Sequence, residues 1–477
     1  MLAPAGVGMA GEVSRMGKRR VMVIGLDCAE PSLAFDRYAS GMPNLRRLMK
    51  RGCWGPLRST IPPITVPAWT CMVSGADPGE LGIYGFRNRK AYDTYEMDFA
   101  TAKAVHVPRL WDVLGDAGLT STALFVPQTY PPAAIRGSMV SCFLTPGADS
   151  DYARPPELKK ELESTFGPYI VDVPDFRTDD KDRLLESIYT MSGQHFGMAR
   201  HLLARSDWDF FMMVDMGCDR FHHGFWKYIA ADHPQHVPGN RWVDTGRDYY
   251  AYLDREIGTL LDLIDDRTAV LVVSDHGAQR MDGSICINDF LIQKGLLALK
   301  EPTTTVTRLK NLSVDWPNTK AWGWGGYVSR VFLNVKGREA QGAVEPADYE
   351  RTRDELIALL KAIPDDKGRP MRTQCFKPNE IYSLDHIEQA PDLIVYFDDL
   401  FWRATEDVGH DSIWSFETEV GPDDAMHAQH GMHILTWPGA RGGIRDDAAD
   451  LIDGAPTILD LLGIPIPDDM EGRSLVQ

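Results

Sequence analysis

The chain has 477 residues, of which 44% are hydrophobic, and its formal net charge is −18 at pH 7. This length is large for one domain, but α/β folds with inserted segments reach it, and the hydrophobic fraction is ordinary for a globular protein. The acidic balance repels polyanions and so excludes long nucleic acid as a partner, whereas a small phosphate ester remains open if bound metal ions offset the charge locally.

The first stretch, residues 1–19, is rich in glycine and alanine, and we expect a disordered leader there. The apolar run at residues 21–26 is too short for a signal sequence and predicts the first strand. No segment approaches the roughly 18 apolar residues of a membrane span, so no membrane partner is expected. The seven cysteines form no CxxC pair, which indicates free thiols in a reducing compartment and a cytoplasmic location.

Residues 20–477 are expected to form one catalytic domain of the α/β class. Short apolar runs that read as buried parallel strands alternate with longer amphipathic segments, a pattern typical of a mostly parallel sheet with helices on both faces. The predicted strands are residues 21–26, 122–126, 210–214, 269–273 and 393–397, and the predicted helices are residues 43–51, 110–117, 182–205, 243–264, 349–363 and 455–463.

Two stretches interrupt this alternation. Residues 86–104 are polar and aromatic, and the segment around 300–391 is long, with a tryptophan-rich centre. Insertions of this kind often cover an active site, so we expect the second stretch to form a cap segment.

Three aspartates, Asp27, Asp219 and Asp275, each follow a predicted strand. Ligands of an open parallel sheet bind outside the carboxyl ends of its strands, so these side chains can converge, although an aspartate there can also cap a helix or form a turn. Histidines favour a metal site, because His276 is adjacent to Asp275 and His223 lies one helical turn after Asp219. Imidazole and carboxylate together suit zinc, manganese or iron.

The other histidines are assigned by position. His222 would point away from His223 on a helix, and we expect a structural or supporting role for it. His433 begins an apolar run and is expected in a core strand. His427 and His430 remain as late candidate ligands.

Thr65 lies in a proline-rich segment, and a helix is predicted to begin near Pro67. A hydroxyl at the positive end of a helix meets anions, and a metal ion could lower its pKa. The alternative is that Thr65 only caps the helix.

Together these features resemble the alkaline phosphatase superfamily, and most closely its type I phosphodiesterase/nucleotide pyrophosphatase branch. The resemblance extends from about residue 21 to about residue 475. It rests on six motifs in family order: Gly25-Leu26-Asp27, Thr65-Val66-Pro67, Asp219-Arg220-Phe221-His222-His223, Ser274-Asp275-His276-Gly277, the segment from His427 to Gly431, and Ala455-Pro456-Thr457-Ile458-Leu459 with Met470-Glu471-Gly472.

The resemblance implies a fold with an alkaline-phosphatase-like sheet and two divalent ions bridged by the substrate phosphate, with zinc expected and manganese as the alternative. Carried over by position, Asp27, Thr65, Asp275 and His276 would hold one ion. Asp219, His223 and His427 would hold the other, with His430 as the alternative to His427. It also implies a two-step transfer in which Thr65 becomes transiently phosphorylated.

Two departures from related patterns bear on specificity. Nucleotide pyrophosphatases usually carry an asparagine three residues after the nucleophile, but this chain has Ala68, so its phosphate contacts must come from backbone N–H groups or another side chain. Sulfatases need a cysteine or serine followed by an arginine, and Thr65 with Trp69 argues against one.

Candidate substrate contacts lie mostly in the expected cap. Trp322, Trp324 and Tyr327 could stack on a base or form a buried aromatic cluster. Arg87, Lys90 and Arg330 are candidate anion contacts.

The expected function is hydrolysis of a small phosphoester, possibly a nucleotide, by a phosphodiesterase or nucleotide pyrophosphatase. The alternatives are a phosphomonoesterase or phosphoglycerate mutase-like phosphotransferase, and a non-catalytic metal-binding protein. The sequence leaves the natural substrate and the oligomeric state open.

Overall fold

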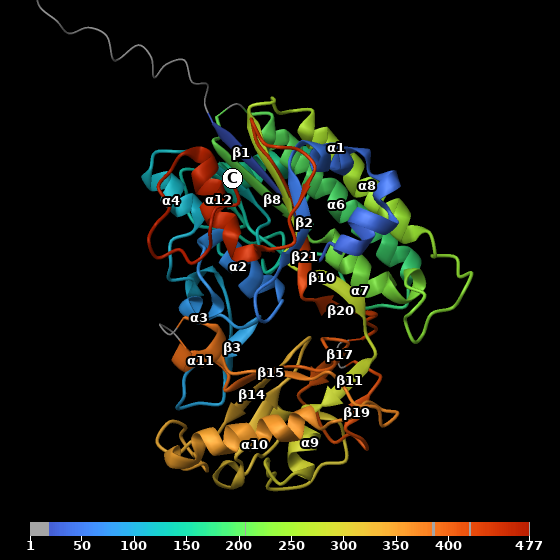
Figure 1. Ribbon diagram of the computed structural model, residues 1–477, viewed down its shortest axis with the longest axis vertical. Coiled ribbons are helices and arrows are strands. Elements are labelled where there is room, and N and C mark those ends of the chain that lie inside the picture. The colour runs from blue at the N-terminus through green and yellow to red at the C-terminus, as the bar shows by residue number, and fades with distance from the viewer. Residues whose placement is uncertain (1–18, 206, 384–386, 419–420, 477) are drawn as a thin grey trace, which may run out of the picture.

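The computed structural model describes residues 19–205, 207–383, 387–418 and 421–476. The predicted leader, residues 1–19, lies outside the described residues apart from Arg19. The chain forms a large lobe built around a sheet and a smaller second lobe that faces one edge of this sheet (Figure 1).

The large sheet has a parallel centre. Its order there is β9 (Thr268–Val273), β1 (Arg20–Leu26), β8 (Phe210–Asp215), β5 (Ser121–Leu124) and β6 (Gly137–Val140), all parallel to their neighbours. Antiparallel β21 (His430–Thr436) and β2 (Cys53–Arg58) extend it beyond β9, where β22 (Ile444–Arg445) and β23 (Ala449–Asp450) pair with β2. At the other end lies β7 (Ala153–Arg154). The predicted mostly parallel α/β sheet is confirmed.

Helices cover both faces of the sheet, as Figure 1 shows. Met22 and Ile24 of β1 belong to the core under one set of helices: α1 (Pro43–Arg51), α5 (Pro156–Phe166), α6 (Lys181–Leu203), α7 (Gly217–Ile229) and α8 (Thr245–Leu261). Val21 and Val23 belong to the core under the other set: α2 (Thr65–Ser74), α4 (Leu110–Asp116) and α12 (Gly454–Leu462). Each such side chain, fully buried, stabilises the fold by about 1.5–3 kcal/mol. Alternate residues of one strand thus hold both layers onto the sheet.

The second lobe is built on antiparallel pairs. Its main sheet has the order β13 (Ala321–Trp324), β14 (Ser329–Leu333), β16 (Leu393–Tyr396) and β15 (Gln374–Phe376), and α9 (Ile287–Gln293) and α10 (Tyr349–Lys361) contribute to its core. A smaller sheet joins β17 (Trp402–Thr405), β11 (Gly283–Cys286) and β19 (Trp414–Ser415). The predicted insertion at 300–391 lies in this lobe, which also includes β11 and β17 on either side of that range. The chain also contains several short elements, among them α3 (Pro78–Leu81), α11 (Pro378–Ile381), β12 (Thr307–Arg308) and β18 (Asp407–Val408).

One predicted strand belongs to a different sheet from the one expected. The pattern of residues 393–397 predicts a strand of the parallel sheet, but β16 pairs antiparallel with β14 and β15 in the second lobe. A continuous apolar run reports burial on both faces, and it carries no information about which strands lie beside it.

Two pairs of strands connect the lobes near the expected site. The chain passes between the lobes through β10 (Gly277–Arg280) and β20 (Ala425–Ala428), which pair with each other. The hairpin of β3 (Arg87–Arg89) and β4 (Met97–Phe99) reaches the second lobe, where Arg89 forms a buried ion pair with Glu339 at 2.8 Å. None of the helices in the described residues has the length and apolar character needed to cross a membrane.

Candidate active site

Thr65 is the first residue of α2 and lies at the carboxyl edge of the parallel strands. Its side chain is 2% exposed, and its Oγ1 lies 3.5 Å from Oδ1 of Asp27 and 3.3 Å from Nε2 of His276. The helix begins two residues before the predicted start at Pro67. Its N-cap is Ile64, and no side chain caps it. Thr65 therefore does not serve as the cap, and its hydroxyl faces a carboxylate and an imidazole at the positive end of the helix.

Asp27 follows β1 directly and Asp275 comes two residues after the end of β9, as predicted, and both are fully buried. Asp27 accepts a 2.7 Å hydrogen bond from the indole of Trp69, and Oδ1 of Asp275 accepts one of 3.2 Å from the backbone N–H of Cys28. Burial raises the pKa of both carboxyls, and nearby carboxylates raise them further. Such a set of buried acids is stable in its charged form only beside compensating positive charge.

His276 is held in the tautomer that a metal ligand needs. Its Nδ1 lies 3.2 Å from the carbonyl of Gly277, to which it donates, so Nε2 carries the lone pair. This nitrogen lies 3.3 Å from Oδ2 of Asp275 and 3.7 Å from Oδ1 of Asp27. Burial lowers the pKa of His276 to about 4, which keeps the ring neutral.

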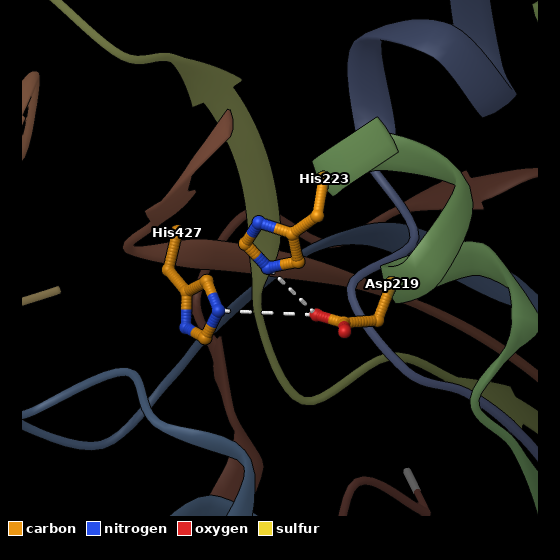
Figure 2. A group of neighbouring side chains, drawn as sticks. All are labelled: Asp219, His223 and His427. Atoms are coloured by element: carbon orange, nitrogen blue, oxygen red, sulfur yellow. Dashed lines mark ion pairs between the residues drawn. The ribbon is translucent and has the colours of Figure 1, made fainter. Parts of the chain in front are cut away.

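A second group consists of Asp219, His223 and His427 (Figure 2). Asp219 and His223 lie four residues apart on α7, as predicted, with His223 Nε2 at 3.2 Å from Asp219 Oδ1. His427 comes from β20, and its Nε2 lies 3.8 Å from the same carboxylate oxygen. Figure 2 shows the carboxylate facing both rings.

His427 presents an unused lone pair to this group. Its Nδ1 lies 2.8 Å from the carbonyl of Pro63, to which it donates, and its Nε2 has no hydrogen-bond partner among the described residues. Oδ2 of Asp275 is likewise without a hydrogen bond. Buried hydrogen-bond acceptors normally have a partner. Imidazole nitrogen and carboxylate oxygen are also the ligand atoms that divalent ions such as zinc prefer.

The structure brings together the seven predicted ligands and separates them from the other histidines. The ligand atoms of Asp27, Asp219 and His276 lie within 4.8 Å of one another, as do those of Asp219, His223 and His427.

The other candidate histidines lie outside these two groups. His430 begins β21 with an exposed side chain and belongs to neither group, and His433 is buried in the same strand. His222 points away, and its Nε2 lies 3.2 Å from the hydroxyl of Tyr250.

Sequence reasoning missed the residues that orient His223. Its Nδ1 donates to Asp423 at 2.7 Å, and although burial opposes it, Asp423 and Asp219 raise the pKa of His223 to about 9. Arg177 pairs with Asp423 at 3.2 Å. The hydroxyl of Tyr327 lies 3.1 Å from His223 Nε2, donates to Asp423 at 3.2 Å and accepts from Arg177 at 2.9 Å. No spacing rule connects residues so distant in sequence.

Arg220 was noted only as part of a motif, yet it fixes Asp219. It contacts the Asp219 carboxylate through Nη1 and binds both oxygens of Asp172 at 2.8 and 2.7 Å. Although burial opposes it, His223 and Arg220 lower the pKa of Asp219, so this carboxyl is charged.

A cavity of about 920 Å³ opens over the site between the two lobes. Thr65, Asp219, His223 and His427 line one part of it, and the predicted substrate contacts Arg87, Trp322, Trp324 and Tyr327 also line it, as does Arg330. Lys90 is not among its lining residues; its ammonium pairs with Glu96 at 3.4 Å.

The aromatic residues of the predicted cap differ in how much side-chain surface is free to contact a substrate. Trp322 is 2% exposed and stacks on Phe332 with ring centroids 4.4 Å apart, so this indole is largely part of the lobe's core. Trp324 is partly buried, and Tyr327 stacks on His427 with centroids 4.0 Å apart. Trp324 therefore has more free surface toward the cavity than Trp322.

A third group of potential ligands lies in the second lobe, away from Thr65. Cys286, Asp289 and His410 have ligand atoms within 4.8 Å of one another. The Asp289 carboxylate already accepts from the backbone N–H groups of Gly409 and His410 and from the His410 ring. This aspartate fixes a loop, which explains the proximity without a metal ion.

Comparison with known proteins agrees with this geometry. The family described as "Type I phosphodiesterase / nucleotide pyrophosphatase" matches residues 21–433. No curated protein matches the chain significantly.

Among solved structures, murine ectonucleotide pyrophosphatase/phosphodiesterase 5, as an inactive threonine-to-alanine variant in complex with AMP, is 13% identical with a TM-score of 0.56, over 94% of this chain and 96% of that one. The murine protein without that substitution and its human counterpart give TM-scores of 0.55 and 0.54 at the same identity and coverage. At this identity the likeness establishes a shared fold.

Proposed function

The chain belongs to the type I phosphodiesterase/nucleotide pyrophosphatase family and is a phosphoester hydrolase, and from this premise we propose that Thr65 is its nucleophile, acting beside two divalent metal ions. The observation that carries the proposal is the position of the Thr65 hydroxyl. It is buried at the positive end of α2, lies within 3.5 Å of Asp27 and His276, and lines the cavity over the site.

The residues present suit two metal ions. Asp27, Asp275 and His276, with the Thr65 oxygen, would hold the first ion, and Asp219, His223 and His427 would hold the second. The raised pKa values of the buried carboxyls and the unpartnered His427 Nε2 support this arrangement. The mixture of imidazole and carboxylate favours zinc, with manganese as the alternative. When bound, such ions neutralise phosphate charge and lower the pKa of coordinated hydroxyls and water.

The reaction we propose has two displacements at phosphorus. In the first, the Thr65 oxygen forms a bond to phosphorus, the ester bond to the leaving group breaks, and the hydroxyl proton passes to that leaving group; with a diester substrate, the phosphate on Thr65 keeps the substrate's other ester group. In the second, a water oxygen forms a bond to that phosphorus, the bond between phosphorus and the Thr65 oxygen breaks, and a proton of the water returns to the Thr65 oxygen. The neutral His276 ring and the charged Asp219 hold fixed positions throughout, because each is anchored by a further contact, to Gly277 and to Arg220 respectively.

The substrate class we propose is a small phosphodiester or pyrophosphate, including nucleotides. The cavity volume of about 920 Å³ lies within the range of pockets that enclose molecules of nucleotide size. The murine relative in complex with AMP supports a nucleotide, and its inactive form carries a threonine-to-alanine change. All seven cysteines are free and six are buried, which supports a cytoplasmic location.

Metal content and two chromogenic substrates test the proposal. We expect two divalent ions per chain and faster hydrolysis of bis-p-nitrophenyl phosphate than of p-nitrophenyl phosphate. Preference for the monoester would favour a phosphomonoesterase or mutase-like phosphotransferase instead. A protein with neither metal nor turnover would be a non-catalytic member of its family.

A further inference from the structure

The cavity over Thr65 is rich in positive charge although the whole chain is strongly acidic. Seven basic and five acidic residues line it among the described residues: Arg87, Arg177, Arg220, Arg308, Lys310, Arg330 and Arg403, with Glu96, Asp98, Asp172, Asp219 and Glu406. Arg177 and Arg220 are accounted for, because each forms an ion pair with an aspartate of the site. The charges of these two arginines are therefore largely neutralised by the paired aspartates.

Arg330 is different because it is buried and forms no ion pair with any of the described residues. It lies on β14 of the second lobe and is 5% exposed. Among the described residues no carboxylate lies within ion-pair distance of its guanidinium. Its one hydrogen bond to them runs from Nη1 to the backbone carbonyl of Arg87, at 2.6 Å. The guanidinium packs against Gly85, where a Cβ would lie 3.3 Å from its Cζ. Backbone on one side therefore holds it in place.

The remaining donors of Arg330 face the cavity. An arginine carries five N–H donors in a planar fork, and the contact with Arg87 uses one of them. Neither Nε nor Nη2 has a hydrogen bond to the described residues, and neither is completely enclosed by protein atoms. Both nitrogens are therefore open to the cavity that Arg330 lines. The side chain of Arg87 lines the same cavity, where its guanidinium lies over the ring of Phe99 at 3.8 Å.

A buried guanidinium remains charged and costs free energy unless an anion compensates it. Burial lowers the pKa of Arg330 to about 10, and the charge of Glu406 offsets this only in part. Among the described residues the compensation is thus incomplete. A planar fork directed at a cavity matches the two oxygens of a phosphate or carboxylate group.

We propose that Arg330, together with Arg87, forms a second anion subsite that binds a phosphate or carboxylate group of the substrate other than the phosphate attacked by Thr65. This inference rests on the proposed function and narrows it. The preferred substrate carries at least one anionic group beyond the scissile phosphodiester. Arg330 belongs to the second lobe and Thr65 to the first, so such a substrate spans the lobes and is selected by both.

The test compares two nucleotide substrates that differ in this feature. Thymidine 5′-monophosphate p-nitrophenyl ester has one anionic phosphate, whereas thymidine 5′-triphosphate has further phosphates beyond the one attacked. In Arg330→Gln the glutamine amide can still donate to the Arg87 carbonyl, but the charge and the fork are lost. We expect the ratio of kcat/KM for the triphosphate to that for the ester to fall by about ten- to a hundredfold, mainly through KM.

Two further variants separate this role from a structural one. Arg330→Lys keeps the charge without the fork and should restore part of the ratio. Arg308→Gln removes one charge from an exposed side chain at the same cavity and should change the ratio by no more than about twofold, because solvent screens it. A loss in Arg330→Gln that is equal for both substrates, or absent for both, overturns the subsite and leaves the proposed function intact.

Inhibitors identify the chemistry of the second group. Inorganic pyrophosphate and succinate are titrated against hydrolysis of the ester. A weaker effect of pyrophosphate in Arg330→Gln assigns a phosphate group, and a weaker effect of succinate assigns a carboxylate. If the wild-type protein hydrolyses neither nucleotide, calorimetric titration with pyrophosphate decides. Binding weakened in Arg330→Gln supports the subsite although the proposed function has failed, and unchanged binding overturns both.

Discussion

Replacing Thr65 by alanine separates catalysis from stability, because the residue contributes very differently to the two. Its side chain is 2% exposed, so the change removes one buried methyl group, worth about 0.8 kcal/mol. It also removes contacts of 3.5 and 3.3 Å to Asp27 and His276, worth about 0.5–1.5 kcal/mol. The total is small beside the roughly 5–15 kcal/mol that stabilises a domain, and alanine suits the first turn of a helix. Thr65→Ala should therefore fold.

Turnover should fall far more. Loss of the nucleophile of a covalent mechanism should lower kcat by at least about 10³-fold, which corresponds to about 4 kcal/mol of barrier. The assay is release of p-nitrophenolate from bis-p-nitrophenyl phosphate, with metal content and melting temperature measured on the same samples. Acid quenching followed by peptide mass spectrometry should detect Thr65 carrying a p-nitrophenyl phosphoryl group in the wild-type protein.

Thr65→Ser is the matched control, because it keeps the hydroxyl and removes only the methyl group. We expect it to retain at least about a tenth of wild-type kcat. If Thr65→Ala keeps more than a tenth of wild-type kcat with normal metal content, Thr65 is not the nucleophile and the assignment of the site fails.

Four further outcomes are expected. Asp219→Asn should lower the metal content from two ions per chain to one, measured by elemental analysis, and full occupancy would contradict the ligand assignment. Tyr327→Phe keeps the ring but loses contacts with His223 and its partners, so affinity for the second ion should fall about tenfold in a competition titration, and unchanged affinity would show that the hydroxyl does not orient the site. Chelation should abolish hydrolysis and lower the melting temperature, since the buried carboxylates then repel one another, and zinc or manganese should restore both; activity that survives complete chelation would exclude metal dependence. Gly25→Ala would place a Cβ 2.6 Å from the Trp69 ring that bonds Asp27, so urea unfolding should show a loss of about 1–3 kcal/mol, and a neutral effect would mean that Trp69 moves freely.

Much of the site could be predicted because its signals are local. The acids at the ends of β1 and β9 follow apolar runs that are buried on both faces, and any parallel sheet brings such ends to one edge. The spacing of Asp219 and His223 reports one helical turn, and the structure places both on one face of α7. The proline pattern around Thr65 predicted a helix start, and only its first residue was misplaced.

The partners of these residues could not be predicted in the same way. Asp423 and Tyr327 contact His223 from 200 and 104 positions away in the chain. The membership of β16 in the second lobe is a similar case, because its apolar run satisfies either sheet. Contacts of this kind depend on how the two lobes pack, and periodicity along one segment does not encode the identity of its neighbours.

The sequence by itself determined the α/β class, the acids at strand ends, the histidines beside them and the threonine at a helix start. These features could be predicted because the spacing of apolar and polar residues reports burial and short-range geometry. The resemblance favoured His427 over His430, and the structure places His427 beside Asp219. Only the tertiary structure decided that Asp423 and Tyr327 contact His223 and that Arg330 lines the same cavity as Thr65. The physical reason is that these relations arise between surfaces of separate elements, whose approach is set by the packing of the whole chain.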